Sequence, residues 1–254
     1  MEFKTYFIYK EKEVRALDAL EAALSRLGLR KSGSGADLVI AIGGDGTFLR
    51  AASMFSSSVI LPLRYKTHFG LLMSYELSKA RIPLNKLAKG EFSIRKEPLI
   101  EASVNGRRYI SAGDFYFQRC GEVAALRYTA LISSGKNTLR ISAVGDGFII
   151  CTPMGSTGYF SYYDRLLGMK PKRLHGFGFE HILPFSISQR SAAGVQQKPK
   201  IRLVLGADFT ARAWPTRGLN QFLYSSAFRN MGIKIGANEV MRFRRSSKEL
   251  RVFV

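Results

Sequence analysis

The feature that most constrains the fold is an apolar run that leads directly into a cluster of glycines. Residues 36–42 read ADLVIAI, and residues 43–50 read GGDGTFLR. A nearly continuous apolar run is typical of a strand that is buried on both faces of a parallel sheet. A second such run, SVILPL at 58–63, follows the segment TFLRAASMF. The two runs predict neighbouring strands of an open α/β sheet with a helix between them.

The residues before this stretch extend the same alternation. TYFIY at 5–9 predicts a first strand, and VRALDALEAALSRLG at 14–28 predicts an amphipathic helix. Its apolar residues recur every three or four positions, and Gly28 ends the run. Strand, helix, strand, helix and strand is the order of an α/β domain with a mostly parallel sheet.

The glycines at 43–46 lie where such a sheet binds ligands. At the carboxyl end of a parallel strand, glycines let backbone N–H groups approach a phosphate, and the following helix adds its positive end. Asp45 does not fit a simple phosphate site, because a carboxylate repels phosphate. It could accept a proton from a hydroxyl or position a phosphate-bound Mg²⁺. Alternatively, Asp45 caps the helix, or the stretch is an ordinary turn.

The second part of the chain has a different character. LIEASVNGRRYIS at 99–111 places Asn105-Gly106 between two alternating runs, which predicts a tight hairpin with positive φ at both turn residues. Further strand-like stretches follow to the end of the chain. We therefore predict an α/β nucleotide-binding domain at 1–97 and a mainly β dinucleotide-binding domain at 98–254, whose last strands could return to the first domain. We expect the active site in the crevice between the two domains.

Composition excludes several classes of protein. The 254 residues are 46% hydrophobic, which is typical of a globular protein, and contain no apolar run long enough to span a membrane. The N-terminus does not resemble a signal peptide, so we expect a cytoplasmic location. Two cysteines and three scattered histidines predict no protein-held metal. The net charge of +20 attracts polyanions but does not select one, and a solvated basic surface explains it as well.

A second glycine-bearing stretch, GDGFIICTPMGSTGY at 145–159, has the same phosphate-friendly composition. Together with GGDGT at 43–47, it resembles the NAD kinases, whose second signature is close to DGLIVSTPTGSTAY. The segment IKIGANEVMRFRRSSKELRVF at 233–253 resembles the closing strands of that family. The resemblance covers most of the chain. It implies phosphoryl transfer from ATP, or polyphosphate, to the 2′-hydroxyl of the adenosine ribose of NAD, which gives NADP.

The resemblance also implies roles for individual residues. Asp45 would take the proton of the 2′-hydroxyl. Apart from the resemblance, Arg50, one turn into the helix, is one of many basic residues that could neutralise phosphate charge. Asp146 would reach the nicotinamide riboside. The loop residues that would receive phosphates or wall the dinucleotide pocket are Gly44, Gly46, Thr47, Ser156, Thr157, Gly158 and Tyr159. Mg²⁺ would arrive with ATP.

The chain departs from the family at three places. The family's Asn followed by an acid becomes Gly113-Asp114, so the acid is kept and the amide is lost. Residues 66–72 read KTHFGLL in place of a Gly-x-Leu-Gly-Phe segment, and Phe69 could supply the missing ring. After the second signature, FSYYDRLLG replaces a glycine-rich tail and offers Ser161 as a pocket residue. Asn238-Glu239 also matches the adenosine-binding string, but we expect it to form a turn.

Two other functions stay open at this point. A related GGDGT kinase would act on a lipid or sugar and would ignore NAD. A non-catalytic protein could use the same scaffold and its basic charge to bind nucleic acid. With NAD kinase as the preferred interpretation, the expected partners are ATP or polyphosphate, NAD and further copies of the chain in a homodimer or homotetramer, and neither nucleic acid nor a membrane.

Overall fold

The computed structural model describes residues 2–14, 17–33, 35–65, 71–121, 124–217, 220–225, 228 and 232–254. The chain forms two compact units, each with its own hydrophobic core. Unit 1 consists of Met1–Glu97 with Lys248–Val254, and unit 2 consists of Pro98–Ser247. Two strands, β6 (Ile94–Val104) and β19 (Met241–Phe253), begin in one unit and end in the other.

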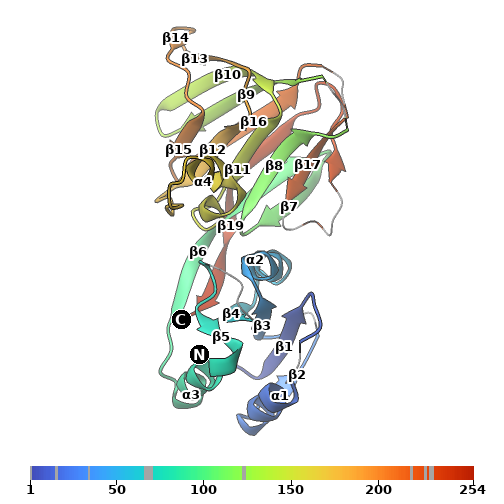
Figure 1. Cartoon of the computed structure of the whole chain (residues 1–254), viewed down its shortest axis with the longest axis vertical. Coiled ribbons are helices and arrows are strands. Elements are labelled where there is room, and N and C mark those ends of the chain that lie inside the picture. The colour runs from blue at the N-terminus through green and yellow to red at the C-terminus, as the bar shows by residue number, and fades with distance from the viewer. Residues whose placement is uncertain are drawn as a thin grey trace. The chain divides into compact units, whose positions relative to one another are not determined.

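Unit 1 contains the predicted parallel sheet. Strand β3 lies between β1 and β4, and the last residues of β19 pair in parallel with β4 (Figure 1). The elements of unit 1 before β6 are β1 (Thr5–Lys10), α1 (Leu17–Arg26), β2 (Arg30–Lys31), β3 (Leu38–Gly43), α2 (Asp45–Met54), β4 (Val59–Arg64), β5 (Tyr75–Glu76), a 3-10 helix (Leu77–Lys79) and α3 (Arg81–Lys89). The α/β class predicted for this part is confirmed.

Burial explains why these segments adopt these structures. All residues of β3 before Gly43 are buried, as expected for a strand covered on both faces. Helix α1 is described over Leu17–Arg26, inside the segment that the apolar pattern predicts, and buries Leu20 and Leu24 in the core of unit 1. Gly28 follows the helix with φ of +78°, a conformation that favours glycine. The pattern therefore placed the helix correctly.

Unit 2 consists almost entirely of antiparallel strands in two sheets. One sheet has the strand order β14-β13-β10-β9-β16-β19, and the other has the order β15-β12-β11-β8-β17-β18 (Figure 1). The remaining strands of unit 2 are β7 (Arg107–Ser111), β8 (Asp114–Arg119), β9 (Leu126–Ser134), β10 (Asn137–Gly145), β11 (Gly147–Cys151), β12 (Phe177–Ile182), β13 (Ser186–Ser191), β14 (Gln196–Gln197), β15 (Arg202–Leu205), β16 (Thr210–Pro215), β17 (Gln221–Ser225) and β18 (Ile233–Lys234). The mainly β class predicted for this part is also confirmed.

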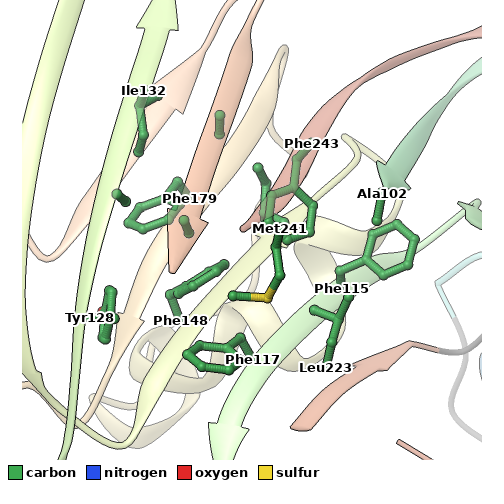
Figure 2. Packing of buried hydrophobic residues seen from close by; sticks show 14 of the residues in the cluster. Ala102, Phe115, Phe117, Tyr128, Ile132, Phe148, Phe179, Leu223, Met241 and Phe243 are labelled. Carbon is green, nitrogen blue, oxygen red and sulfur yellow. The ribbon is translucent and has the colours of Figure 1, made fainter. Parts of the chain in front are cut away.

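Aromatic side chains from both sheets fill the core of unit 2. Phe148 of β11 lies within 5.4 Å of Phe117 and 5.2 Å of Phe179, measured between ring centroids, and Phe243 of β19 lies 5.9 Å away (Figure 2). All four rings are almost completely buried. Burial of rings of this size is the largest stabilising contribution that such a core offers. It fixes the framework on which the loops of unit 2 are held.

The hairpin between β6 and β7 has the predicted turn. Asn105 and Gly106 have φ of +52° and +73°, which matches the type of turn that joins two twisted strands through two residues. Among the described residues, no helix has the length and apolarity needed to cross a membrane.

Candidate functional site

The GGDGT residues form the turn between β3 and α2, as their position after an apolar strand predicts. Strand β3 ends at Gly43, Gly44 is the N-cap of α2, and Asp45 is its first helical residue. A Cβ atom on Gly43 would lie 2.4 Å from the Thr47 hydroxyl oxygen, so a larger residue does not fit there. Gly46 has open space around it and is exposed. The first turn of α2 has N–H groups that the helix itself does not pair, and Gly46 adds no side chain there.

Asp45 binds the segment that follows β4. Its two carboxylate oxygens accept hydrogen bonds from the backbone N–H groups of Leu71 and Leu72, at 2.9 and 3.0 Å. The alternative that Asp45 caps the helix is wrong, because the N-cap is Gly44. The carboxylate is half-buried and keeps unused lone pairs, so it can accept a further hydrogen bond. Phe69, which could supply the missing ring, lies outside the described residues.

Glu11 is a neighbour of the GGDGT turn that the sequence analysis missed. Its carboxylate accepts a hydrogen bond from the Thr47 hydroxyl at 2.9 Å and forms an ion pair with Arg50. Arg50, considered above as a phosphate ligand, is therefore held by an acid, while its Nε has no partner among the described residues. Glu11 directly follows β1, which pairs with β3. Because β1 and β3 are neighbours in the sheet, Glu11 lies beside the GGDGT turn. The sequence alone does not show which strands are neighbours.

The second signature forms the loop after β11 and packs against Gly113. The Thr152 N–H donates to the Gly113 carbonyl at 2.9 Å, and the Thr152 hydroxyl donates to the Ala112 carbonyl at 2.6 Å. A Cβ atom on Gly155 would lie only 2.2 Å from the Gly113 carbonyl oxygen. Gly155 is thus required by close backbone approach. The structure brings together Gly113-Asp114 and the second signature, which are about forty residues apart in the sequence.

Two predicted ligand-binding hydroxyls are used inside this loop. The Ser156 hydroxyl donates to the Pro153 carbonyl at 2.7 Å and accepts from the Leu174 N–H at 3.0 Å. The Ser161 hydroxyl donates to the Gly158 carbonyl at 2.7 Å and is completely buried. Both hydroxyls therefore stabilise the loop. Gly158 and Tyr159 of the same loop are exposed, and Thr157 is buried.

Arg202, on β15 of the same sheet as β11, fixes the loop. Its guanidinium donates two hydrogen bonds to Asp164 of α4 (Tyr162–Leu166), at 2.9 and 3.0 Å, and one to the Phe160 carbonyl at 3.2 Å. It also pairs with Glu180, which is 1% exposed. Burial raises the pKa of Glu180, and the hydrogen bond from Arg202 opposes this shift. One guanidinium thus holds two carboxylates and the loop backbone in place.

Asp114 lies at the start of β8, opposite Cys151 of β11. It is only 9% exposed, and this burial raises its pKa to about 7. A carboxyl group is disfavoured in its charged form when it is removed from water. Near neutral pH, Asp114 is therefore present in both forms, and the protonated form can donate a hydrogen bond.

Asp146 and Tyr159 line one pocket in unit 2. The pocket has a volume of about 560 Å³, and its lining includes Arg119 and Tyr162. Arg119 binds Asp146 through Nε at 2.6 Å. Gly147, the second glycine of Gly-Asp-Gly, has φ of +140°, and a Cβ atom there would lie 1.8 Å from the Phe117 carbonyl oxygen. The glycine is thus required by the turn that places Asp146 at the pocket.

Tyr159 provides an aromatic wall for this pocket. It is 40% exposed, and its ring meets Tyr116 edge to face with centroids 5.4 Å apart. Tyr162 lies on its other side at 6.3 Å. A volume of several hundred Å³ with aromatic walls and a few charged groups is typical of small-molecule sites. The two groups of predicted site residues are thus Gly44–Thr47 in unit 1 and the pocket and loop residues in unit 2.

Asn238-Glu239 forms the turn expected for it. Asn238 has φ of +61°, and the Glu239 carboxylate accepts a hydrogen bond from the Gly236 N–H at 2.6 Å. The turn leads directly into β19.

Comparison with known proteins points to one family. Residues 3–92 match the model of the ATP-NAD kinase N-terminal domain. An NAD kinase of Clostridium kluyveri is 33% identical over 132 residues, which are 50% of this chain and 45% of that protein. An NAD kinase of Saccharolobus solfataricus is 31% identical over 123 residues, which are 48% of this chain and 46% of that protein. The chain spans about half the length of the curated relatives it matches.

Solved structures extend the similarity in fold to the whole chain. A crystal structure of an NAD kinase from Archaeoglobus fulgidus in complex with ATP matches with a TM-score of 0.73 and 16% identity, covering 99% of this chain and 93% of that one. A crystal structure of yeast NADH kinase complexed with NADH matches with a TM-score of 0.75 and 14% identity, covering 100% of this chain and 84% of that one. At these identities the likeness shows the fold alone.

Proposed function

We propose that this chain is a member of the NAD kinase family and that it transfers a phosphoryl group from ATP, or from polyphosphate, to NAD. The acceptor is the 2′-hydroxyl of the adenosine ribose, and the product is NADP. The observation that carries the proposal is the half-buried carboxylate of Asp45, held by two backbone N–H groups at the N-terminus of α2.

Asp45 is proposed to accept a hydrogen bond, and then the proton, from the reacting hydroxyl. Phosphoryl transfer needs in-line placement, neutralisation of the phosphate charge and a proton acceptor at the nucleophile. The bonds from Leu71 and Leu72 fix the orientation of the carboxylate and leave lone pairs for the hydroxyl. A proton acceptor held in this way loses little entropy when the substrate binds.

The first turn of α2 is proposed to receive the phosphates. Gly44, Gly46 and Thr47 offer backbone N–H groups and the positive end of the helix, and the space around Gly46 is open. Mg²⁺ enters with ATP as part of that substrate. Arg50 adds positive charge to the same helix, although Glu11 holds it.

Residues of unit 2 are proposed to bind the dinucleotide. Asp146 and Tyr159 line the pocket and would contact the nicotinamide riboside and its neighbouring groups. The protonated form of Asp114 can donate a hydrogen bond to the adenosine portion, as the amide of the family's Asn would. The remaining residues proposed to shape this site are Gly113, Ser156, Thr157, Gly158 and Ser161.

Incubation of the protein with NAD, ATP and Mg²⁺, followed by detection of NADP, tests the proposal. Asp45→Asn keeps one oxygen as acceptor for one of the two N–H groups, loses the bond to the other and removes the proton acceptor, so we expect the rate to fall about 10²-fold or more. Asp18→Asn, an exposed residue of α1, is the control and should keep full activity. Full activity in Asp45→Asn would refute the role of this carboxylate. Turnover of a lipid or sugar without any NADP would favour the related-kinase alternative.

A further inference from the structure

Arginines stand in register across one sheet of unit 2. Strands β13, β10, β9, β16 and β19 are consecutive neighbours in this sheet (Figure 1). Arg190 of β13 is the direct partner of Arg140 of β10, and Arg140 is the partner of Leu131 of β9. Leu131 is the partner of Arg212 of β16, which is itself the partner of Arg242 of β19. We call Arg190, Arg140, Arg212 and Arg242 the arginine row.

The arginine row lies on the outer face of this sheet. Direct partners on neighbouring strands point to the same face, so the four side chains share one side. All four are exposed, while alternating residues such as Ile141, Ala211 and Phe243 are buried in the core. Neighbouring strands are about 4.8 Å apart, so a row across five strands extends about 19 Å.

The row has no acidic partner among the described residues. The ion pairs found there include none to Arg190, Arg140, Arg212 or Arg242. Two pairs, Arg190 with Arg140 and Arg212 with Arg242, are directly opposite each other, an arrangement of like charges that destabilises a sheet. A bound polyanion would remove this repulsion.

A groove on the same face adds further positive charge. It has a volume of about 510 Å³, and its lining contains Arg212 and Arg242 of the row together with Arg108 and Arg244. Arg244 is paired with Glu101 at 2.9 Å, whereas no ion pair to Arg108 is found among the described residues. The lining also includes Glu101, which pairs with Arg244, and the hydroxyl groups of Ser133, Thr138 and Thr210. Such a surface offers both ionic and neutral hydrogen bonds to phosphate oxygens.

We propose that the outer face of this sheet binds single-stranded nucleic acid through its phosphates. Leu131 lies between the charged pairs, and Trp214 follows Arg212 by two positions on β16 and so shares its face; both are half-buried. A chain in which phosphates alternate with sugars and bases matches this mixture of guanidinium and apolar groups. Inorganic polyphosphate has no apolar part. The large exposed apolar side chains that a membrane surface would take up are absent from the five described strands of this face.

The total charge of +20 does not select a partner, but the register of the arginines does. This inference does not depend on the proposed kinase activity, because none of the residues invoked has a role in it. Binding and turnover can therefore be measured separately on the same protein.

The test is the binding of a fluorescein-labelled single-stranded RNA of roughly 16 nucleotides, followed by anisotropy at several salt concentrations. The triple variant R140Q/R212Q/R242Q should bind at least tenfold more weakly than wild type in 0.1 M salt. The slope of log K against log salt should shrink by about 2, since roughly 0.7 counterion is released per phosphate contact. The control variant R30Q/R81Q/K89Q removes the same charge from exposed positions of unit 1 and should bind within twofold of wild type.

Several results would overturn the proposal. They are the absence of RNA binding in wild type, equal weakening in the two triple variants, and displacement of the RNA by inorganic polyphosphate at an equal concentration of charge. Row-dependent binding to phosphatidylserine vesicles without RNA binding would assign the face to a membrane instead. Thermal melting checks folding, and the triple variant should melt at or above the wild-type temperature because repulsion within the row is removed.

Discussion

Replacing Gly46 by alanine separates what the α2 turn needs for stability from what it needs for binding. Gly46 is the second residue of α2, and a Cβ atom built there meets no atom within 4 Å. Its backbone is not in the left-handed region, so alanine fits without strain. Such a replacement stabilises a protein by about 0.4–1 kcal/mol, because it reduces the freedom of the unfolded chain. For a chain of this length the melting temperature should rise by about 1–4 °C.

The same methyl group should harm phosphate binding. If phosphates approach the N–H groups of this turn, the new Cβ lies on their path and moves them from the in-line position. We expect kcat/KM for ATP to fall about tenfold or more, which corresponds to about 1.4 kcal/mol of lost transition-state stabilisation. A variant that is more stable and less active cannot be explained by damage to the fold.

Thermal melting and NADP formation, measured on the same preparations, check this prediction. Gly33→Ala is a matched control, because Gly33 also has open space around it, and activity should not change. Gly43→Ala is the opposite control, since its Cβ would lie 2.4 Å from the Thr47 hydroxyl oxygen, and we expect a loss of about 1–3 kcal/mol of stability. Unchanged ATP kinetics in Gly46→Ala would refute the proposed approach of phosphate to this turn.

Other variants test the contacts around both groups of site residues. Glu11→Gln should lower the free energy of unfolding by about 1 kcal/mol in urea titrations, because it removes the half-buried ion pair with Arg50 of α2. The control Glu76→Gln removes an exposed ion pair with Lys79 and should change the free energy of unfolding by under about 0.5 kcal/mol. Arg202→Met should cost about 3–5 kcal/mol, since it leaves two carboxylates without their guanidinium; a loss under about 1 kcal/mol would contradict that. Burial raises the pKa of Asp114 to about 7. The contribution of the Asp114 carboxyl group to stability is therefore complete below about pH 4 and is lost as the pH rises through 7. The stability of Asp114→Asn relative to wild type should increase by about 4 kcal/mol between pH 4 and 8. Burial lowers the pKa of His181 to about 4. The contribution of the neutral imidazole to stability is therefore complete above about pH 6.5 and is lost as the pH falls to 4. In His181→Phe the loss of stability on acidification should be smaller by about 3 kcal/mol, and an unchanged dependence of stability on pH would contradict this.

Local patterns in the sequence predicted much of the fold because the physics behind them is local. The apolar runs at 36–42 and 58–63 became buried parallel strands, since a strand covered on both faces needs apolar residues throughout. Asn105-Gly106 became the predicted hairpin turn, because those two residues tolerate positive φ. The helix at 17–26 followed its apolar spacing, because one face of an amphipathic helix packs on the core.

The partners of the candidate site residues were harder to predict, because they lie far away in the sequence. Asp45 was a candidate from its glycine-rich surroundings, but its bonds to Leu71 and Leu72 join residues 26 and 27 positions apart. The interpretation of Arg50 as a free phosphate ligand changed once Glu11 was found beside it. Ser156 and Ser161 have the composition of ligand-binding residues, yet their hydroxyls stabilise the loop.

The sequence by itself determined the strand, turn and helix that carry Asp45 and the hairpin turn at Asn105-Gly106. These features follow from periodicity and from the allowed φ of single residues, which depend on near neighbours only. The tertiary structure decided that Glu11 holds Arg50, that Asp114 is buried enough to titrate near neutrality, and that Arg212 stands opposite Arg242. Each of these depends on which strands are neighbours and in what register, and a shift of one residue would turn every side chain to the other face.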